Sequence, residues 1–329
     1  MSFLKRFGID TYMLLLIGVV ILGAALPVSG VAAQILGKVT YWAVALLFFI
    51  YGAKLDLDAV KAGIMNLRLQ SLSFLATYVM FPLVGIALAW VFGGILGPDL
   101  ALGLVFLSVL PSTIQSSIAF TAMAHGNVPA AICSASLSNL VAVVLTPALM
   151  ALVLHQSGGI SMDAVTKIAT QILLPFVLGQ LLRRWIGPTI QRHKAITMVV
   201  DRGSILLIVY SAFSASTVAG LWSSVPPLQL LSIAVVIGLY VALMMTLTHF
   251  AGMRSGLSQP DRTTLFFCGS TKSLASGLPI ATALFAADRV GMIVLPLMLF
   301  HLLQLLACAI IAQRLAFRLT SAPLPQRHG

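Results

Sequence analysis

The sequence contains no glutamate, so aspartate supplies all eight of its acidic residues. Charged residues of both signs make up only 8% of the 329 residues, whereas a water-soluble domain of this size carries roughly 25%. This shortage excludes an ordinary soluble domain. Because no carboxylate pair and no pairing of a nucleophile with a base lies inside an apolar run, we do not expect an enzyme. The aspartates fall in predicted loops or at the ends of apolar runs, at Asp10, Asp56, Asp58, Asp99, Asp163, Asp201, Asp261 and Asp288.

Cysteine is also scarce, and Cys133, Cys268 and Cys308 all lie inside apolar runs. An odd, buried set of cysteines excludes a disulfide framework. The sequence shows no metal-ligand spacing, and we expect no cofactor other than a sodium ion, which the arguments below disfavour. The net charge of +11 does not predict a nucleic-acid partner, because basic residues in a membrane protein mainly record its orientation.

Long apolar runs make up most of the chain, which is 60% hydrophobic. The runs have the length of about 17–25 residues that a helix needs to cross the hydrocarbon core of a bilayer. The sequence therefore predicts an all-α polytopic membrane protein, embedded in the lipid bilayer of the plasma (inner) membrane. Ten spans are predicted, at residues 12–28, 38–53, 68–92, 99–123, 128–154, 164–183, 198–220, 227–252, 262–286 and 290–316.

The distribution of basic residues supports ten spans with both termini in the cytoplasm. This placement puts fifteen of the 19 lysines and arginines on the cytoplasmic side and three outside, as the positive-inside rule requires. Ten spans divide into two five-helix repeats, residues 1–155 and 156–320, followed by a short cytoplasmic tail at 321–329. A repeat with an odd number of spans inserts in inverted orientation, an arrangement common in secondary transporters.

One lysine, Lys272, lies in the middle of the ninth span. Its surroundings read F-F-C-G-S-T-K-S-L-A-S-G-L-P at Phe266–Pro279, with hydroxyls at Ser270, Thr271 and Ser273. A charge at bilayer depth costs several kcal/mol, so it normally faces the protein interior or water. Non-helical backbone at that depth survives only within protein or along a cavity. The stretch predicts an unwound helix at a binding site; the alternative is a lysine whose long stem reaches the membrane interface.

The fourth span carries a second cluster of hydroxyls. It reads L-P-S-T-I-Q-S-S-I-A-F-T at Leu110–Thr121 and places Ser116, Ser117 and Thr121 at mid-depth. Helix breakers and polar residues in corresponding spans of two halves indicate the binding site of a transporter. The alternative is that these hydroxyls bond their own backbone or a neighbouring helix. The residues that follow, His125–Asn127, have the pattern of a cytoplasmic turn.

Three stretches resemble the bile acid:sodium symporter family. The stretch L-P-F-V-L-G-Q-L-L-R at 174–183 is similar to the family's sixth span, and residues 267–279 are similar to its ninth, where the lysine resembles the sodium/bile acid cotransporter seven-like branch. The fourth span resembles the family's crossing helix through Pro111, Ser116, Ser117, Thr121, Gly126 and Asn127. The resemblance implies ten helices in two inverted five-helix repeats. Spans 1, 2, 6 and 7 would form a panel, and spans 3–5 and 8–10 a core in which spans 4 and 9 are discontinuous and cross.

The resemblance also implies where ions bind, because sodium ions in the sodium-coupled members sit beside this crossing. Here Ser270 and Leu274 stand at the positions of a glutamate and a glutamine, and Thr77 at that of a further glutamine. Hydroxyl positions of the fifth span fall on alanines, with Ser134 and Ser136 beside them. Hard cations prefer oxygen ligands that include carboxylates, so these residues argue against sodium coupling.

The sequence therefore predicts a secondary active transporter of an organic, anionic solute. Either Lys272 stays charged and holds the substrate, or it gains and loses a proton during the cycle. The alternative is a regulatory membrane protein without transport, for example one affecting calcium handling. His301 and Gln304, one turn apart in the tenth span, are interpreted as a hydrogen-bonded helix contact rather than a proton relay. The predicted substrate- and ion-binding residues are Lys272, Ser270, Thr271, Ser273, Ser116, Ser117, Thr121, Asn127, Thr77, Ser134 and Ser136.

Overall fold

The computed structural model of this chain describes residues 11–54, 66–155, 166, 168–220 and 226–320, and all of their regular secondary structure is helical. The first half contains α2 (Thr11–Ala25), α3 (Gly30–Lys54), α5 (Leu67–Leu75), the π-helix η1 (Ala76–Met80), α6 (Phe81–Ser108), α7 (Gln115–Met123) and α8 (Val128–His155). The second half contains the π-helix η2 (Ile168–Leu173), α10 (Leu174–Arg192), α11 (Lys194–Val218), α12 (Pro227–Arg254), α13 (Gln259–Gly269), α14 (Leu274–Leu284) and α15 (Ala287–Thr320). The predicted tail at 321–329 lies outside the described residues.

The described helices have the length and surface of a membrane protein. Six segments are long and apolar enough to cross a bilayer, namely α3, the run Leu67–Ser108, α8, α11, α12 and α15, and α2 is a shorter apolar helix. Large apolar side chains point outward, with Trp42 70%, Trp90 85% and Phe317 72% exposed. An apolar surface of this extent suits lipid rather than water. The prediction of an all-helical membrane protein is confirmed.

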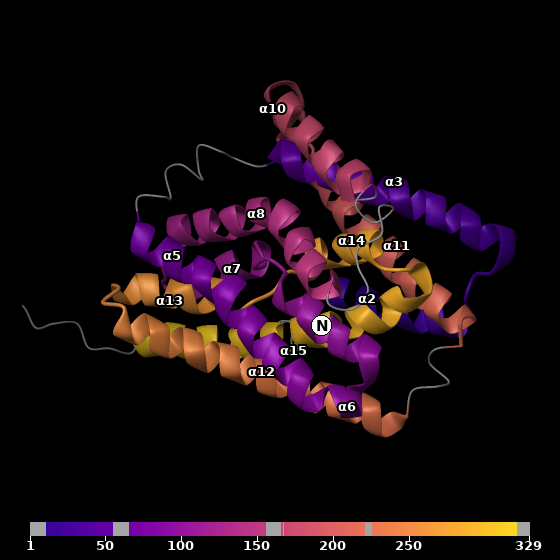
Figure 1. Ribbon diagram of the computed structural model, residues 1–329. Coiled ribbons are helices and arrows are strands. Elements are labelled where there is room, and N and C mark those ends of the chain that lie inside the picture. Colours follow the sequence, from indigo (N-terminus) through magenta and orange to yellow (C-terminus); the bar gives the residue numbers. More distant parts are fainter. Residues whose placement is uncertain (1–10, 55–65, 156–165, 167, 221–225, 321–329) are drawn as a thin grey trace, which may run out of the picture.

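Four helices, α2, α3, α10 and α11, pack together and are called the panel group here. Figure 1 shows α3 and α10 crossing in its upper part. They approach so closely that a Cβ atom at Gly52 would strike the carbonyl of Phe176, and one at Gly179 would strike the carbonyl of Phe49. Small residues at crossings are the usual means by which membrane helices pack. These are the helices that the family resemblance assigns to a panel.

The remaining helices, α5 to α8 and α12 to α15, are called the core group. Its centre is an aromatic cluster of Phe81, Tyr240 and Phe300, which is fully buried and has ring centroids 5.4–5.7 Å apart. Tilted and edge-to-face contacts of this kind are favourable. The hydroxyl of Tyr240 donates to the carbonyl of Phe81 at 2.7 Å. The panel group contacts the core group mainly where α11 packs against α15.

Two helical paths are interrupted inside the core group. The first break, residues 109–114, separates α6 from α7, and the second break, residues 270–273, separates α13 from α14. The breaks touch, because the N–H of Ser273 donates to the carbonyl of Pro111 at 2.8 Å. Proline cannot donate a backbone hydrogen bond and disfavours a continuous helix. The interruptions fall where the polar clusters of the fourth and ninth spans predicted them.

A sharp bend in α6 joins the predicted third and fourth spans. Gly97 has φ +75° and is followed by Pro98. Glycine adopts a positive φ at little cost, whereas other residues do not. The side-chain amide of Gln229 in α12 donates to the carbonyl of Leu96 beside the bend. The run Leu67–Ser108 therefore folds back on itself although its helical hydrogen bonding is nearly continuous.

Candidate functional site

The side chain of Lys272 lies in the second break and is completely buried, with 0% of its surface exposed. Its Nζ donates to the backbone carbonyls of Thr77 at 2.8 Å, Ser108 at 2.7 Å and Leu110 at 2.5 Å, which we call the carbonyl cage. The same atom lies 4.1 Å from the ring centroid of Phe81. No carboxylate among the described residues pairs with it. The head group is thus inside the protein and not at a membrane interface.

The carbonyl of Thr77 is available to Lys272 because of a proline one turn later. In η1 the N–H of Phe81 donates to the carbonyl of Ala76 instead. The next residue, Pro82, has no N–H. The donors four and five residues after Thr77 are therefore used or absent, and a side chain from elsewhere must satisfy this carbonyl.

The other two cage carbonyls are available because α6 ends there. The last carbonyls of a helix have no partners within the helix, and Pro111 removes the donor three residues after Ser108. The donor four residues after Ser108 is also used, since the N–H of Ser112 donates to the hydroxyl of Ser138 at 3.0 Å. The sequence thus leaves three buried acceptors around one point, and Lys272 supplies the donors.

The number of hydrogen bonds fits the ammonium form of Lys272 in this arrangement. Three acceptors match the three N–H donors of an ammonium, whereas a neutral amine has only two. A hydrogen bond to a charged group contributes about 1.5–3 kcal/mol, and a desolvated cation–π contact about 2 kcal/mol. Together these offset the several kcal/mol that burial of an ion costs. All three donors are occupied, so no donor remains for direct contact with a substrate.

The backbone of Lys272 is held by a single side chain, Gln304 of α15, which is also fully buried. Its Oε1 accepts from the N–H of Lys272 at 2.7 Å, and its Nε2 donates to the carbonyl of Lys272 at 2.8 Å. Nε2 also lies 2.9 Å from Nδ1 of His301. The backbone fixes the orientation of the amide, so Nδ1 of His301 accepts and a neutral imidazole carries its proton on Nε2. The hydrogen bond expected between His301 and Gln304 is present.

Three buried hydroxyls join the breaks behind this lysine. The Oγ1 of Thr271 lies 3.0 Å from Oγ of Ser112 and 2.9 Å from Oγ of Ser117. Thr271 and Ser117 also donate to the carbonyl of Phe267 at 2.8 and 3.3 Å. These hydroxyls bond one another and the backbone. This is the alternative to solute binding that was given for the hydroxyls of the fourth span.

A cavity of about 710 Å³ lies between the panel group and the breaks. Its apolar lining includes Phe48, Phe120 and Phe176. The polar lining on the core side consists of Thr113, Gln115, Ser116, Ser136, Asn139, Ser273, Ser276 and His301. The polar lining on the panel side consists of Tyr12, Tyr51, Lys54, Asp201 and Arg202. The first turns of α7 and α14 both face this space.

The panel side of the cavity carries charge on α11, at Asp201 and Arg202, and at the end of α3, at Lys54. The hydroxyl of Tyr51 donates to Oδ1 of Asp201 at 2.9 Å, and the guanidinium of Arg202 lies 4.9 Å from the ring centroid of Tyr12. Lys54, the last residue of α3, is exposed in the same wall. The described residues of this wall thus include the cations Lys54 and Arg202 and the carboxylate of Asp201.

The structure brings most of the predicted site residues to the junction of the breaks, in two layers. Those that line the cavity are Ser116, Ser136 and Ser273. Those that lie buried behind it are Lys272, Thr77, Ser117 and Thr271. The layer behind the cavity fixes the geometry of the breaks, and the layer in front is available to a solute.

Four predicted residues lie apart from both layers. Ser270 is buried and donates to the carbonyl of Phe266 in its own helix at 2.6 Å. Thr121 in α7 and Ser134 in α8 are buried. Asn127 belongs to a turn, where its amide donates to Asp261 at 2.8 Å. That location fits the turn predicted for His125–Asn127.

Sequence reasoning did not select Asn139 and Arg202. The Nδ2 of Asn139 donates to the carbonyl of Ser112 at 2.7 Å, and its Oδ1 accepts from the hydroxyl of Ser276 at 2.7 Å. A polar amide in the middle of a predicted span was the signal that could have found it. Arg202 was assigned first to the orientation of the chain in the membrane and second to contact with anionic lipid, and its place in the cavity wall depends on how α11 packs.

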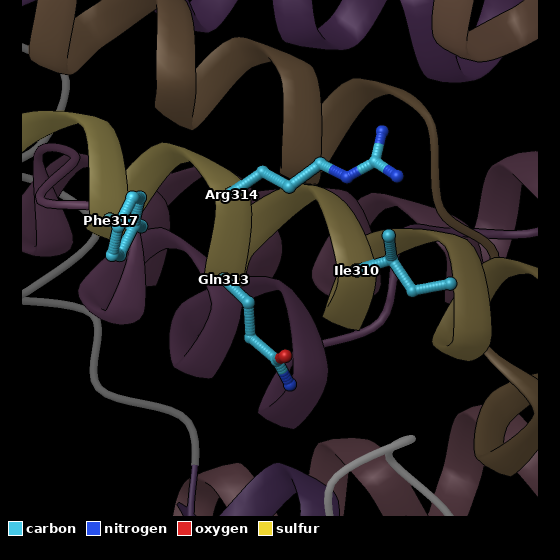
Figure 2. Close-up of a pocket in the computed structure, with 4 residues that line it drawn as sticks. All are labelled: Ile310, Gln313, Arg314 and Phe317. Atoms are coloured by element: carbon cyan, nitrogen blue, oxygen red, sulfur yellow. The ribbon is translucent and has the colours of Figure 1, made fainter.

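A second hollow, of about 590 Å³, lies far along α15 and is lined by Ile310, Gln313, Arg314 and Phe317. Figure 2 shows all four side chains on the same helix. None of them comes from a break or from the cavity wall. This hollow has no part in the site described above.

Comparison with known proteins gives a family and several relatives. The sequence model of the SBF-like CPA transporter family matches residues 10–317. The chain is 50% identical to an uncharacterized protein of Pseudomonas aeruginosa over 315 residues, which is 95% of each chain. It is 45% identical over 314 residues, 94% of each chain, to YfeH of Escherichia coli (strain K12), a candidate symporter by its name. It is 28% identical over 282 residues to the sodium/bile acid cotransporter 7 of Mus musculus, covering 82% of this chain and 80% of the relative.

Proposed function

The chain belongs to the SBF-like CPA transporter family, and from this premise we propose that it carries an amphipathic organic anion through the cavity at the two breaks. Membership of the family makes it a transporter and not an enzyme. One observation carries the more specific proposal. The first turns of α7 and α14 both line the cavity, so two helix N-termini face a solute bound there.

Electrostatics of the cavity wall favours an anion. The N-terminus of a helix carries roughly half a positive charge and presents N–H groups that suit anionic ligands. Lys54 and Arg202 contribute positively charged groups on the panel side of the described lining. An acidic group of the solute is therefore expected between the half-helix N-termini and Arg202.

The rest of the wall favours a hydrocarbon body on the same solute. Phe48, Phe120 and Phe176 line the cavity together with leucine, isoleucine and valine side chains. A volume of about 710 Å³ lies within the range of about 300–1,000 Å³ for small-molecule pockets. His301 also lines the cavity, whereas Asn139 has both amide hydrogens on backbone carbonyls and positions the break.

The proposed architecture is ten membrane crossings in two inverted five-helix repeats with both termini in the cytoplasm of the inner membrane. A break in the fourth predicted span of each half and the asymmetric distribution of basic residues support it. The panel group and the core group would move relative to each other and expose the cavity to the two sides in turn. The contact between α11 and α15 is the interface at which this movement occurs.

Ligand stabilisation of the purified protein tests the proposal. A ligand that binds only the folded state raises the apparent stability by RT ln(1 + [L]/Kd). The probes are carboxylates and sulfonates with hydrocarbon parts of increasing size, each paired with its neutral amide. We expect the anions to raise Tm and the amides not to, and uptake of the active anions into proteoliposomes should follow.

A matched pair of variants locates the binding. Arg202→Gln should weaken the stabilisation by anions at least several-fold, because a charge in the cavity wall is lost. Arg184→Gln removes an exposed arginine of α10 outside the cavity lining and should leave it unchanged. Equal stabilisation by the neutral amides, or equal effects of the two variants, would contradict an anion site in this cavity.

A further inference from the structure

We propose that the Lys272 ammonium is a tethered monovalent cation, which fills a cation site formed by the carbonyl cage and replaces a free alkali ion between the breaks. Three backbone oxygens, from Thr77, Ser108 and Leu110, converge on its Nζ within 2.5–2.8 Å. The face of Phe81 closes one further side at 4.1 Å. This is a coordination shell of neutral oxygens around one buried positive charge.

Backbone carbonyls are the oxygen ligands with which proteins replace the hydration shell of alkali cations. The cage carbonyls come from η1, from the end of α6 and from the first break, and none of them can find a donor in its own helix. Buried carbonyls without any partner are rare because they are costly. Donors at this point are therefore required, and the second break brings a covalently attached group that supplies them.

The site is completed only when the two breaks meet. Lys272 belongs to the second break, and its backbone is fixed by Gln304 while its head group reaches the acceptors of the other half. A tether thus replaces the binding and release of an ion. For transport, a consequence that depends on the function proposed above, a sodium gradient contributes no driving force.

Chemical rescue of a truncated side chain tests the cation site itself. Lys272→Ala removes three methylene groups and the ammonium, which together correspond to n-propylammonium. We expect Lys272→Ala to lower Tm and n-propylammonium to restore it in a saturable manner, with sodium or potassium restoring it in part. The neutral molecule 1-propanol should not restore it. Lys38→Ala, which removes an exposed lysine of α3, should respond to none of these additions.

The protein contains a suitable reporter for this measurement. Cys133, Cys268 and Cys308 are all buried, so a thiol-reactive fluorescent dye labels them on unfolding. If Lys272→Ala is not recovered in folded form, the protein is expressed and purified in n-propylammonium, and Lys272→Gly is tested with n-butylammonium in the same way. A failure of both variants to gain stability from their matching amines, from sodium and from potassium overturns the proposal.

The unaltered protein gives an independent test. Its Tm and its uptake of a stabilising anion should be the same in sodium, potassium and choline buffers. Saturable stabilisation by sodium alone would overturn the tethered cation even if the variants behave as expected. If organic anions stabilise the protein but none of the cation effects is seen, the transport proposal stands and the tethered-cation proposal falls. If amines rescue the variants but no anion binds, the tethered-cation proposal stands and the anion-transport proposal falls.

Discussion

The two breaks satisfy their backbones by different means. Side chains from other helices donate hydrogen bonds to the backbone carbonyls of the first break. Thr146 of α8 donates to the carbonyl of Val109 at 2.7 Å, Lys272 to that of Leu110, and Asn139 to that of Ser112. In the second break one amide, that of Gln304, bonds both the N–H and the carbonyl of Lys272. Among the described residues, the backbone of the first break thus depends on several side chains, whereas the backbone of Lys272 in the second break depends on one.

This difference shows that the two halves are not chemically equivalent even though each contains a break at a corresponding place. The first half supplies oxygen atoms and the second half supplies the charge. Neither set is satisfied alone, because the carbonyl cage lacks donors and the ammonium lacks acceptors. We infer that the two breaks fold as one cooperative unit. The following substitutions should lower the free energy of unfolding by amounts that decrease in the order given.

The largest effect is expected from Lys272→Met, which keeps most of the length of the side chain and removes its charged end. Three buried carbonyls then lose their donor. Each buried acceptor left without a donor costs about 1–3 kcal/mol, so the loss of three should lower the free energy of unfolding by about 3 kcal/mol or more. Chemical denaturation in detergent measures it, with Lys38→Met as the control. A loss as small as that of the control would show that the cage does not need a cation.

The next largest effect is expected at Gln304. Gln304→Leu leaves the N–H and the carbonyl of Lys272 unpaired, and each unpaired buried group costs about 1–3 kcal/mol. Gln304→Glu keeps an acceptor for the N–H but loses the donor to the carbonyl and to His301. We expect both variants to lower the free energy of unfolding, and Glu to cost at least as much because a buried carboxylate is added. A Gln304→Glu variant as stable as the unaltered protein would refute this account of the second break.

Asn139→Ala should have a smaller effect, because the first break has several donors. It removes the bond to the carbonyl of Ser112 and the bond accepted from Ser276. We expect a loss of about 1–2 kcal/mol in the free energy of unfolding, below that of Gln304→Leu, measured in the same denaturation series. If Asn139→Ala cost more than Gln304→Leu, the ranking of the two breaks would be reversed.

The sequence predicted the position of both breaks because local chemistry determines them. Pro111 and the polar residues around Lys272 are visible in any linear reading, and the length of the apolar runs indicates membrane helices. Which layer each hydroxyl occupies was not predictable in the same way. Ser116 and Ser117 are neighbours in the sequence, yet one lines the cavity and the other bonds Thr271 behind it.

The cage also could not be predicted from the sequence. Its acceptors are backbone atoms, which carry no residue signature, and they come from segments about 160–200 positions away from Lys272 along the chain. The signal that exists is indirect. Pro82 and Pro111 each remove a backbone donor, and counting such missing donors would have identified Thr77 and Ser108 as carbonyls in need of a partner.

The smallest effect is expected from Ser270→Ala, compared with Ser273→Ala in the same break. The hydroxyl of Ser270 donates to a carbonyl of its own helix and is absent from the cavity lining, and such bonds contribute little to stability. Ser273 lines the cavity and caps α14 by accepting from the N–H of Ser276 at 3.1 Å. Loss of a cap costs about 1 kcal/mol. Ser273→Ala should therefore lower both Tm and the stabilisation by organic anions, while Ser270→Ala changes neither. Loss of anion stabilisation in Ser270→Ala with none in Ser273→Ala would mean that the solute binds on the opposite side of the second break from the cavity.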